Sequence, residues 1–318
     1  MNAPKIAVVG SYATGLTMRV ERLPSQGETL LGTGYRVDYG GKGSNQAVGC
    51  ARLGARVSFV AKIGNDAFGE MALELYRDEG IDVSHVAQTG DAPTGVGFIM
   101  VDASGNNCIT IDPGANELLT ADDVSREEAP FDTAKAVLTQ LEIPVAAAEA
   151  AMARGRVKGA LTILNPAPVR PLPESILQLV DIITPNQSEA RVLAGRSPNE
   201  VCDAEEIARD LIRCGVKQVV MTLGEKGALI VTGSSSLRVP ALKMDAVDTT
   251  GAGDAFNAGL AMALACGAGL EDAVRFAVVT GGLAVTREGV IPSLPNRDEV
   301  LRCYRQNGMN PPDWLATS

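Results

Sequence analysis

The stretch that decides the fold is Val247-Asp248-Thr249-Thr250-Gly251-Ala252-Gly253-Asp254-Ala255-Phe256-Asn257. A strand-like run, Ser236–Val239, precedes it, and the alanine-rich segment 255–265 that follows is typical of a helix. The loop Gly251-Ala252-Gly253 is therefore predicted to lie at a helix N-terminus, where free backbone N–H groups and the helix dipole favour an anion. Two glycines let a phosphate approach the backbone without interference from a Cβ atom.

Asp254 follows this loop directly and has two interpretations. It is either an ordinary N-cap of the helix or a base beside a phosphoryl-transfer site, where an anion cradle and a proton acceptor must be adjacent. The local sequence leaves both interpretations open, so the rest of the chain has to decide between them.

The composition narrows the class of protein. The chain has 318 residues and a net charge of −10, which suits one large α/β domain and argues against a nucleic-acid partner. There is no uncharged apolar run of about 18 residues, so no membrane span is predicted. The six cysteines show no metal-type spacing and His85 is the one histidine, which predicts reduced thiols in a cytoplasmic protein without a zinc site or a Ser-His-Asp triad.

Strands and helices alternate along most of the chain. The run Lys5–Gly10 is typical of a buried parallel strand. Further strands are predicted at 57–62, 136–139, 160–164, 181–184 and 217–222, and helices at 66–79, 120–128, 144–155, 173–179, 187–194 and 203–214. This order predicts a parallel sheet with helices on its faces. No linker or repeat interrupts it, so residues 1–318 are expected to form a single domain, with 307–318 as a loose tail.

Four extended segments do not fit a helix-covered parallel sheet. They lie at about 16–20, 29–39, 94–101 and 107–111. We expect them to form a small separate sheet, a lid built from about 12–40 and 94–112. Its exposed face is predicted to carry Val96, Phe98, Met100 and Ile109, and such an apolar face favours pairing with a second copy of the chain.

A glycine-rich segment, Gly40-Gly41-Lys42-Gly43-Ser44-Asn45-Gln46-Ala47, runs into a predicted helix that ends near Leu53. So many glycines at a helix start are unfavourable for stability alone. They favour close approach of a hydroxylated ligand, with hydrogen bonds from Lys42 and Asn45. The alternative is a loop-to-helix turn with a solvated lysine, and the spacing excludes a Walker A loop.

Polar residues follow four of the predicted strands. The sets are Gln140-Leu141-Glu142, Asn165-Pro166-Ala167-Pro168, Thr184-Pro185-Asn186-Gln187-Ser188-Glu189 and Thr222-Leu223-Gly224-Glu225-Lys226-Gly227. Ligands in open α/β sheets bind at the carboxyl ends of the strands. These sets and Asp254 therefore predict one polar rim, which favours the catalytic interpretation of that aspartate.

Together these motifs resemble the ribokinase (PfkB-type) family of carbohydrate and nucleoside kinases, from Ile6 to about Pro295. The resemblance implies a ribokinase-like three-layer α/β sandwich with a central, mostly parallel sheet and a small β-sheet lid. It also implies a homodimer joined through the lid, and transfer of the ATP γ-phosphoryl group to a sugar hydroxyl.

The resemblance further implies roles for individual residues. Asp254 would be the general base, and Gly251, Ala252 and Gly253 the anion hole. The sugar would contact Gly41, Lys42, Asn45 and Glu142, and ATP would contact Asn186, Thr222, Gly224, Gly227 and Gly253. Glu189 would hold Mg²⁺ through water. A monovalent cation, K⁺, would bind at Asp248, Thr250, Ala284, Arg287, Gly289 and Ser293.

The chain departs from the family pattern after its first strand. Ribokinases present an Asn and an Asp to the sugar hydroxyls where this sequence has Ala13 and Gly15. Loss of two polar contacts predicts that ribose is a poor substrate, and leaves a deoxysugar, a branched sugar, a polyol or a bulkier ligand open. A nucleoside kinase and a non-catalytic sugar-binding regulator remain alternatives, although binding alone needs no base such as Asp254.

Overall fold

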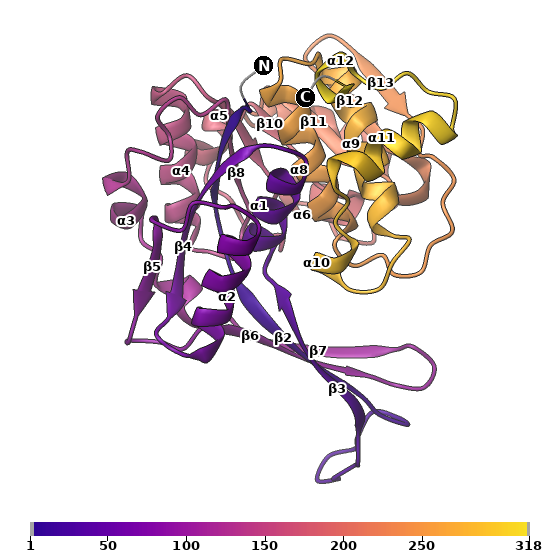
Figure 1. The fold of residues 1–318 in the computed structure, drawn as a ribbon. Coiled ribbons are helices and arrows are strands. Elements are labelled where there is room, and N and C mark those ends of the chain that lie inside the picture. The colour runs from indigo at the N-terminus through magenta and orange to yellow at the C-terminus, as the bar shows by residue number, and fades with distance from the viewer. Residues whose placement is uncertain (1–2, 317–318) are drawn as a thin grey trace.

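The computed structural model describes residues 3–316 and contains two β-sheets (Figure 1). The strands of the larger sheet are β1 (Lys5–Val9), β4 (Arg56–Gly64), β5 (Val86–Thr89), β8 (Ala136–Thr139), β9 (Leu161–Leu164), β10 (Ile182–Ile183), β11 (Gln218–Thr222), β12 (Ala228–Val231) and β13 (Ser236–Val239). Their order is β13-β12-β11-β10-β9-β8-β1-β4-β5. The strands from β11 to β5 are parallel, and β12 and β13 add an antiparallel edge.

Helices cover both faces of this sheet (Figure 1). They are α1 (Lys42–Arg52), α2 (Ala67–Asp78), α3 (Ala121–Arg126), α4 (Val145–Val157), α5 (Glu174–Leu179), α6 (Gln187–Leu193), α7 (Ala204–Arg213), α8 (Ala252–Ala265), α9 (Leu270–Ala284), α10 (Val290–Ser293), α11 (Arg297–Gln306) and α12 (Asp313–Ala316), with short 3₁₀ turns η1 (Gly114–Leu118) and η2 (Gly224–Lys226). Alternate residues of β1 enter two separate cores, because successive strand side chains point to opposite faces. Ile6 belongs to the core that residues of α1, α2, α8 and α9 also enter, and Ala7 belongs to the core that residues of α4 and α7 enter.

The predicted α/β alternation is confirmed, with several differences. Strand β5 and the helices from α9 to α12 were not predicted. Another strand that was not predicted, β12, is a run of four buried apolar residues that pairs with β11. Helix α8 begins at Ala252, three residues before the predicted start, so Asp254 lies in its first turn. Among residues 3–316, no helix combines the length and the apolar character that a membrane span requires.

The smaller sheet projects from the body of the molecule (Figure 1). Its strands are β2 (Ala13–Arg19), β3 (Thr33–Gly40), β6 (Gly95–Val101) and β7 (Asn107–Asp112), in the order β3-β2-β6-β7. Phe98 pairs with Thr110, and Ile99 pairs with Ile109. Side chains alternate along a strand, so Ile109 lies on the face opposite Phe98. The prediction that Val96, Phe98, Met100 and Ile109 share one face is therefore wrong for Ile109.

The C-terminal segment is not the loose tail that its composition suggests. Arg297 donates hydrogen bonds to the carbonyl oxygens of Trp314 and Leu315. The Trp314 ring packs edge-on against Phe276 with the ring centroids 4.9 Å apart. The tail prediction is therefore wrong up to residue 316, and residues 317–318 lie outside the described part.

Candidate active site

The first turn of α8 and the segment before it form the centre of the site. Gly251 is the N-cap with φ of 81°, a left-handed conformation that favours glycine. A Cβ atom at this position would lie 2.6 Å from Cγ1 of Val290. Gly253 is exposed and has open space where a side chain would be. The Ala252 N–H donates to the Thr249 carbonyl oxygen at 3.3 Å, whereas the N–H groups of Gly251 and Gly253 have no hydrogen-bond partner among residues 3–316. These two groups can therefore bind an anion.

Asp254 is buried in this turn, with 6% of its surface exposed. Its Oδ2 accepts a hydrogen bond from Nδ2 of Asn45 at 2.8 Å, and its Oδ1 accepts one from Nε2 of Gln46 at 2.9 Å. Its carboxylate therefore pairs with α1 side chains rather than capping α8. Burial raises the pKa of Asp254, and the positive charge of Lys42 and the two amide donors oppose that rise only in part.

Gln46 is a site residue to which the sequence analysis gave no role. Its Nε2 donates to Oδ1 of Asn165 at 3.1 Å as well as to Asp254, and its Oε1 accepts from Nε2 of Gln140 at 2.6 Å. These contacts fix which end of the Gln46 amide faces Asp254. Gln46 lies in the glycine-rich motif and Gln140 in the polar set after β8, so both motifs had been singled out from the sequence. Their contact could not be predicted, because the two residues lie 94 positions apart in the chain.

Lys42 and Glu142 lie on the neighbouring part of the rim. Oε2 of Glu142 accepts hydrogen bonds from the Lys42 backbone N at 2.8 Å and from the Ser11 hydroxyl at 2.6 Å. Burial by itself lowers the pKa of Lys42, but the charges of Asp254, Glu142 and Glu189 outweigh that effect and raise it. Lys42 is therefore the positive centre of an acidic rim.

Packing explains part of the glycine-rich motif. Gly41 is the N-cap of α1 with φ of 88°, and a Cβ atom there would lie 2.6 Å from Cα of Tyr12. A side chain at Gly43 would collide with the Ser11 backbone. These glycines let α1 lie against the β1–β2 connection, whereas the prediction ascribed them to close approach of a ligand.

A cavity of about 740 Å³ opens beside the first turn of α8. Its lining includes four residues of the predicted ATP set: Thr222, Gly224, Gly227 and Gly253. Apolar walls that were not predicted include Leu242, Met244, Phe256 and Val285. Its size and largely apolar lining are usual for a cofactor-sized ligand.

Asn186 and Glu189 lie at the start of α6, next to this cavity. Asn186 forms a β-bridge with Thr222, and its backbone N donates to Oε2 of Glu189 at 2.8 Å. Burial raises the pKa of Glu189, with the Asn186 hydrogen bond and Lys42 opposing it. The residues from 3 to 316 include no cluster of three His, Cys, Asp or Glu side chains that could hold a metal. One carboxylate suits Mg²⁺ that keeps most of its water ligands, as the prediction for Glu189 requires.

The residues predicted for a monovalent cation surround the loop before α10. Asp248 accepts hydrogen bonds from the backbone N atoms of Thr250 at 2.9 Å and Gly289 at 3.1 Å. Burial by itself raises the pKa of Asp248, but hydrogen bonds from the side chain and backbone of Thr250 and from Gly289, with the charge of Arg36, outweigh that effect and lower it. Arg287 donates to the Ser293 carbonyl oxygen at 3.4 Å, and the buried Ala284 ends α9. The six residues therefore lie around this loop, and a Cβ atom added at Gly251 would collide with Val290, the first residue of α10.

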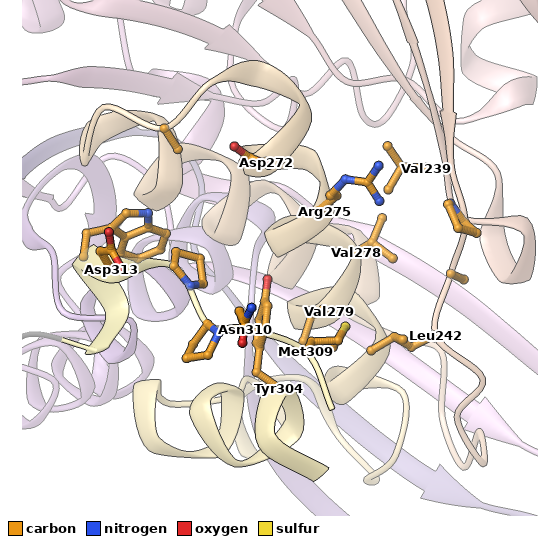
Figure 2. A pocket seen from close by; sticks show the side chains of 16 residues that line it. Val239, Leu242, Asp272, Arg275, Val278, Val279, Tyr304, Met309, Asn310 and Asp313 are labelled. Atoms are coloured by element: carbon orange, nitrogen blue, oxygen red, sulfur yellow. The ribbon is translucent and has the colours of Figure 1, made fainter. Parts of the chain in front are cut away.

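Figure 2 shows a second cavity, of about 680 Å³, between α9, α11 and the C-terminal segment. It shares Ala241, Leu242 and Val278 with the first cavity. Tyr304 lines it, and burial raises the pKa of this phenol to about 12. Residues 309–314 of the C-terminal segment form one wall of this cavity.

Comparisons with known proteins identify the family. The profile of the pfkB family of carbohydrate kinases matches residues 3–297. A ribokinase of Haemophilus influenzae is 37% identical over 296 residues, which are 93% of this chain and 97% of that protein. The crystal structure of ribokinase from Thermotoga maritima has a TM-score of 0.88 at 35% identity and covers 95% of this chain and 99% of its own.

A second solved structure is that of Arabidopsis thaliana ribokinase complexed with ribose and ATP. It has a TM-score of 0.86 at 34% identity, and the match covers 94% of this chain and 98% of that one. The resemblance to the ribokinase family and the three-layer fold are both confirmed. The chain belongs to the pfkB family of carbohydrate kinases and is an ATP-dependent kinase of a sugar hydroxyl.

Proposed function

We propose that Asp254 takes the proton of the acceptor hydroxyl while the γ-phosphoryl group of ATP lies at the first turn of α8. The hydroxyl oxygen forms a bond to phosphorus, its proton passes to the Asp254 carboxylate, and the bond to the departing ADP breaks. The N–H groups from Gly251 to Gly253 stabilise the negative charge of the transferring group. The observation that carries this proposal is the buried Asp254 carboxylate, held by Asn45 and Gln46 beside those N–H groups.

The acceptor is proposed to bind against Gly41, Lys42, Asn45 and Glu142. The Asn45 amide nitrogen already donates to Asp254, whereas its buried Oδ1 has no hydrogen-bond partner among residues 3–316. A buried acceptor without a partner is unfavourable, and a substrate hydroxyl would satisfy it. The Lys42 ammonium group would donate a hydrogen bond to the sugar, and its positive charge would offset the negative charges of the acidic groups around it.

ATP is proposed to occupy the cavity of about 740 Å³, with Thr222, Gly224, Gly227 and Gly253 along its phosphate side. Asn186 and Glu189 would face the phosphates, and Glu189 would hold Mg²⁺ through water. When bound, Mg²⁺ neutralises phosphate charge. K⁺ would be held by the six residues Asp248, Thr250, Ala284, Arg287, Gly289 and Ser293. It would act on the anion hole through the contact between Val290 and Gly251.

We also place the reaction in the cytoplasm, where all six cysteines remain reduced thiols.

A coupled ADP-release assay over pentoses, deoxypentoses, hexoses, polyols and nucleosides tests the proposal. We expect ADP release that requires an acceptor, with carbohydrates preferred to nucleosides and ribose a poor acceptor. Stoichiometric sugar binding without ADP release would instead identify a regulator. A nucleoside as the best acceptor would favour the nucleoside kinase alternative.

A further inference from the structure

One face of the small sheet looks towards the rim of the site. Arg36 on β3 lies with Nη1 3.6 Å from Oε2 of Glu288, in the loop that leads into α10. Its charge also lowers the pKa of Asp248. Because alternate residues of a strand share a face, Asp38 lies on the same side as Arg36. Asp38 therefore faces the loop that also touches the anion hole.

The neighbouring strand leaves space beside Asp38. Gly15 of β2 pairs directly with Asp38, and Ala13 lies two residues away on the same face. A Cβ atom at Gly15 would make only ordinary contacts, at 3.7 Å from Cβ of Asp38 and 3.7 Å from Cδ1 of Ile99. The backbone at Gly15 does not have a positive φ, so neither backbone strain nor crowding requires glycine there. The space beside Gly15 is therefore bordered by the Asp38 side chain on β3 and by the apolar side chain of Ile99 on β6.

The Asp38 carboxylate has hydrogen-bonding capacity to spare. Its Oδ2 lies 3.5 Å from the Thr17 hydroxyl and 3.5 Å from Nε of Arg36, which is the long limit of a hydrogen bond. No other side chain or backbone N–H among residues 3–316 forms a hydrogen bond or ion pair with it. Its side chain is 40% exposed. An ionised carboxylate offers about four acceptor positions, so most of them are available to a ligand.

We propose that Asp38 is a specificity-determining residue, whose carboxylate accepts hydrogen bonds from hydroxyl groups at the end of the acceptor remote from the phosphorylated one. This inference rests on the proposed function, which places the acceptor against Gly41, Lys42, Asn45 and Glu142, and Gly41 directly follows the end of β3. Neighbouring strands are about 4.8 Å apart, so a hydroxyl group bound at Asp38 on β3 is displaced by about that distance from one bound at the position of Gly15 on β2. The acceptor that fits is a neutral polyhydroxy compound larger than a pentose: a hexose or a six-carbon polyol. Sugar acids are disfavoured by repulsion from Asp38, Glu142 and Asp254.

The test compares kcat/KM for ribose, fructose, glucose and sorbitol in the wild type and in Asp38→Asn. We expect a six-carbon acceptor to be preferred, and the substitution to lower its kcat/KM about 10- to 100-fold, mainly through KM. Ribose should change less than about threefold, because it does not reach Asp38. Asp112→Asn is the matched control, because Asp112 pairs with Val96 and so lies on the opposite face of the same sheet. It should change neither value.

A second variant separates recognition from folding. In the double substitution Gly15→Asp with Asp38→Ala, the carboxylate moves across to β2, and the preference should shift towards ribose. An unchanged kcat/KM for the six-carbon acceptor in Asp38→Asn, an equal loss for ribose, or a wild type that prefers ribose would each overturn the inference while leaving the kinase proposal intact. If the wild type releases no ADP with any acceptor, the proposed function fails and this inference fails with it.

Discussion

At the level of single residues, the proposed chemistry depends on how the buried Asp254 carboxylate is held. Asp254 is taken out of water, which raises its pKa, yet each of its oxygens accepts a hydrogen bond from an amide. The amides favour the ionised form and burial favours the neutral form. A raised pKa makes the carboxylate a better proton acceptor near neutral pH than an exposed aspartate.

Replacement of Asp254 by Asn removes the proposed base and keeps the size of the side chain. We expect kcat to fall by about two to four orders of magnitude, the usual range for loss of a general base. ATP affinity should persist, because the proposed anion hole consists of backbone N–H groups. Steady-state kinetics and calorimetric titration with ATP measure the two effects, and near-normal turnover of a folded variant would exclude Asp254 as the base.

Replacement of Gln46 by Leu removes one of the two donors to the carboxylate. The base works in its ionised form, so activity falls as the pH drops through its pKa. With one donor lost, that pKa rises further, and the acid side of the kcat profile should move to higher pH. Gln178→Leu, an exposed glutamine on α5, is the control and should leave the profile in place. A profile that does not move in Gln46→Leu would contradict a positioning role.

At the scale of elements, the start of α8 and the loop before α10 form one unit. Gly251 adopts φ of 81° and packs directly against Val290. The same loop contributes Gly289, whose backbone N donates to Asp248 at 3.1 Å. A change in the loop would therefore reach the proposed anion hole by direct contact rather than over a distance.

Gly251→Ala should weaken both stability and turnover. A left-handed non-glycine residue costs roughly 1–2 kcal/mol, and the added methyl group would also displace Val290. Gly267→Ala is a matched control, because Gly267 has φ of 87° with open space around it and lies beyond the other end of α8. Urea unfolding should show a loss of stability in both variants, whereas kcat should fall only in Gly251→Ala. Equal kcat values in the two variants would argue against a role of the first turn of α8 in phosphoryl transfer.

The cation proposal belongs to the same unit. We expect higher rates in potassium than in sodium salts, and the lowest rates in choline salts at equal ionic strength. The reason is that a cation near Asp248 adds positive potential to the anion hole. Rates that are equal in the three salts would show that the loop works without a bound ion.

At the scale of the whole molecule, the small sheet exposes an apolar outer face. On this face Phe98 is 54% exposed, Tyr35 60%, Met18 38% and Val37 37%. The strands β3 and β7 are also edges with unpaired backbone groups. An uncovered apolar sheet of this kind favours pairing with a second copy.

We therefore expect a homodimer with about twice the chain mass of 33.1 kDa. Phe98→Asp should give a monomer, because a buried unpaired charge opposes association. Val157→Asp, at a residue that is 77% exposed on α4, is the control and should stay dimeric. Light scattering at micromolar concentration measures the mass, and a monomeric wild type would refute the dimer.

Features that depend on local pattern could be predicted without the structure. The strands predicted at 136–139 and 236–239 coincide with β8 and β13, because a short apolar or alternating run between turn residues favours a strand. The helix start near Gly251 and the polar rim followed from the same kind of pattern, and the motifs together were specific enough for the family.

Relations between residues far apart in the chain could be established from the folded structure alone. Asp254 could be a cap or a base on its local sequence, and its partners Asn45 and Gln46 lie 209 and 208 positions away. The face of Ile109 and the position of Asp38 opposite Gly15 depend on strand register. The C-terminal segment is ordered by Arg297, whose hydrogen bonds no local pattern reveals. The physical reason is that periodicity encodes which side of an element is apolar, whereas pairing between elements is set by the packing of the whole chain.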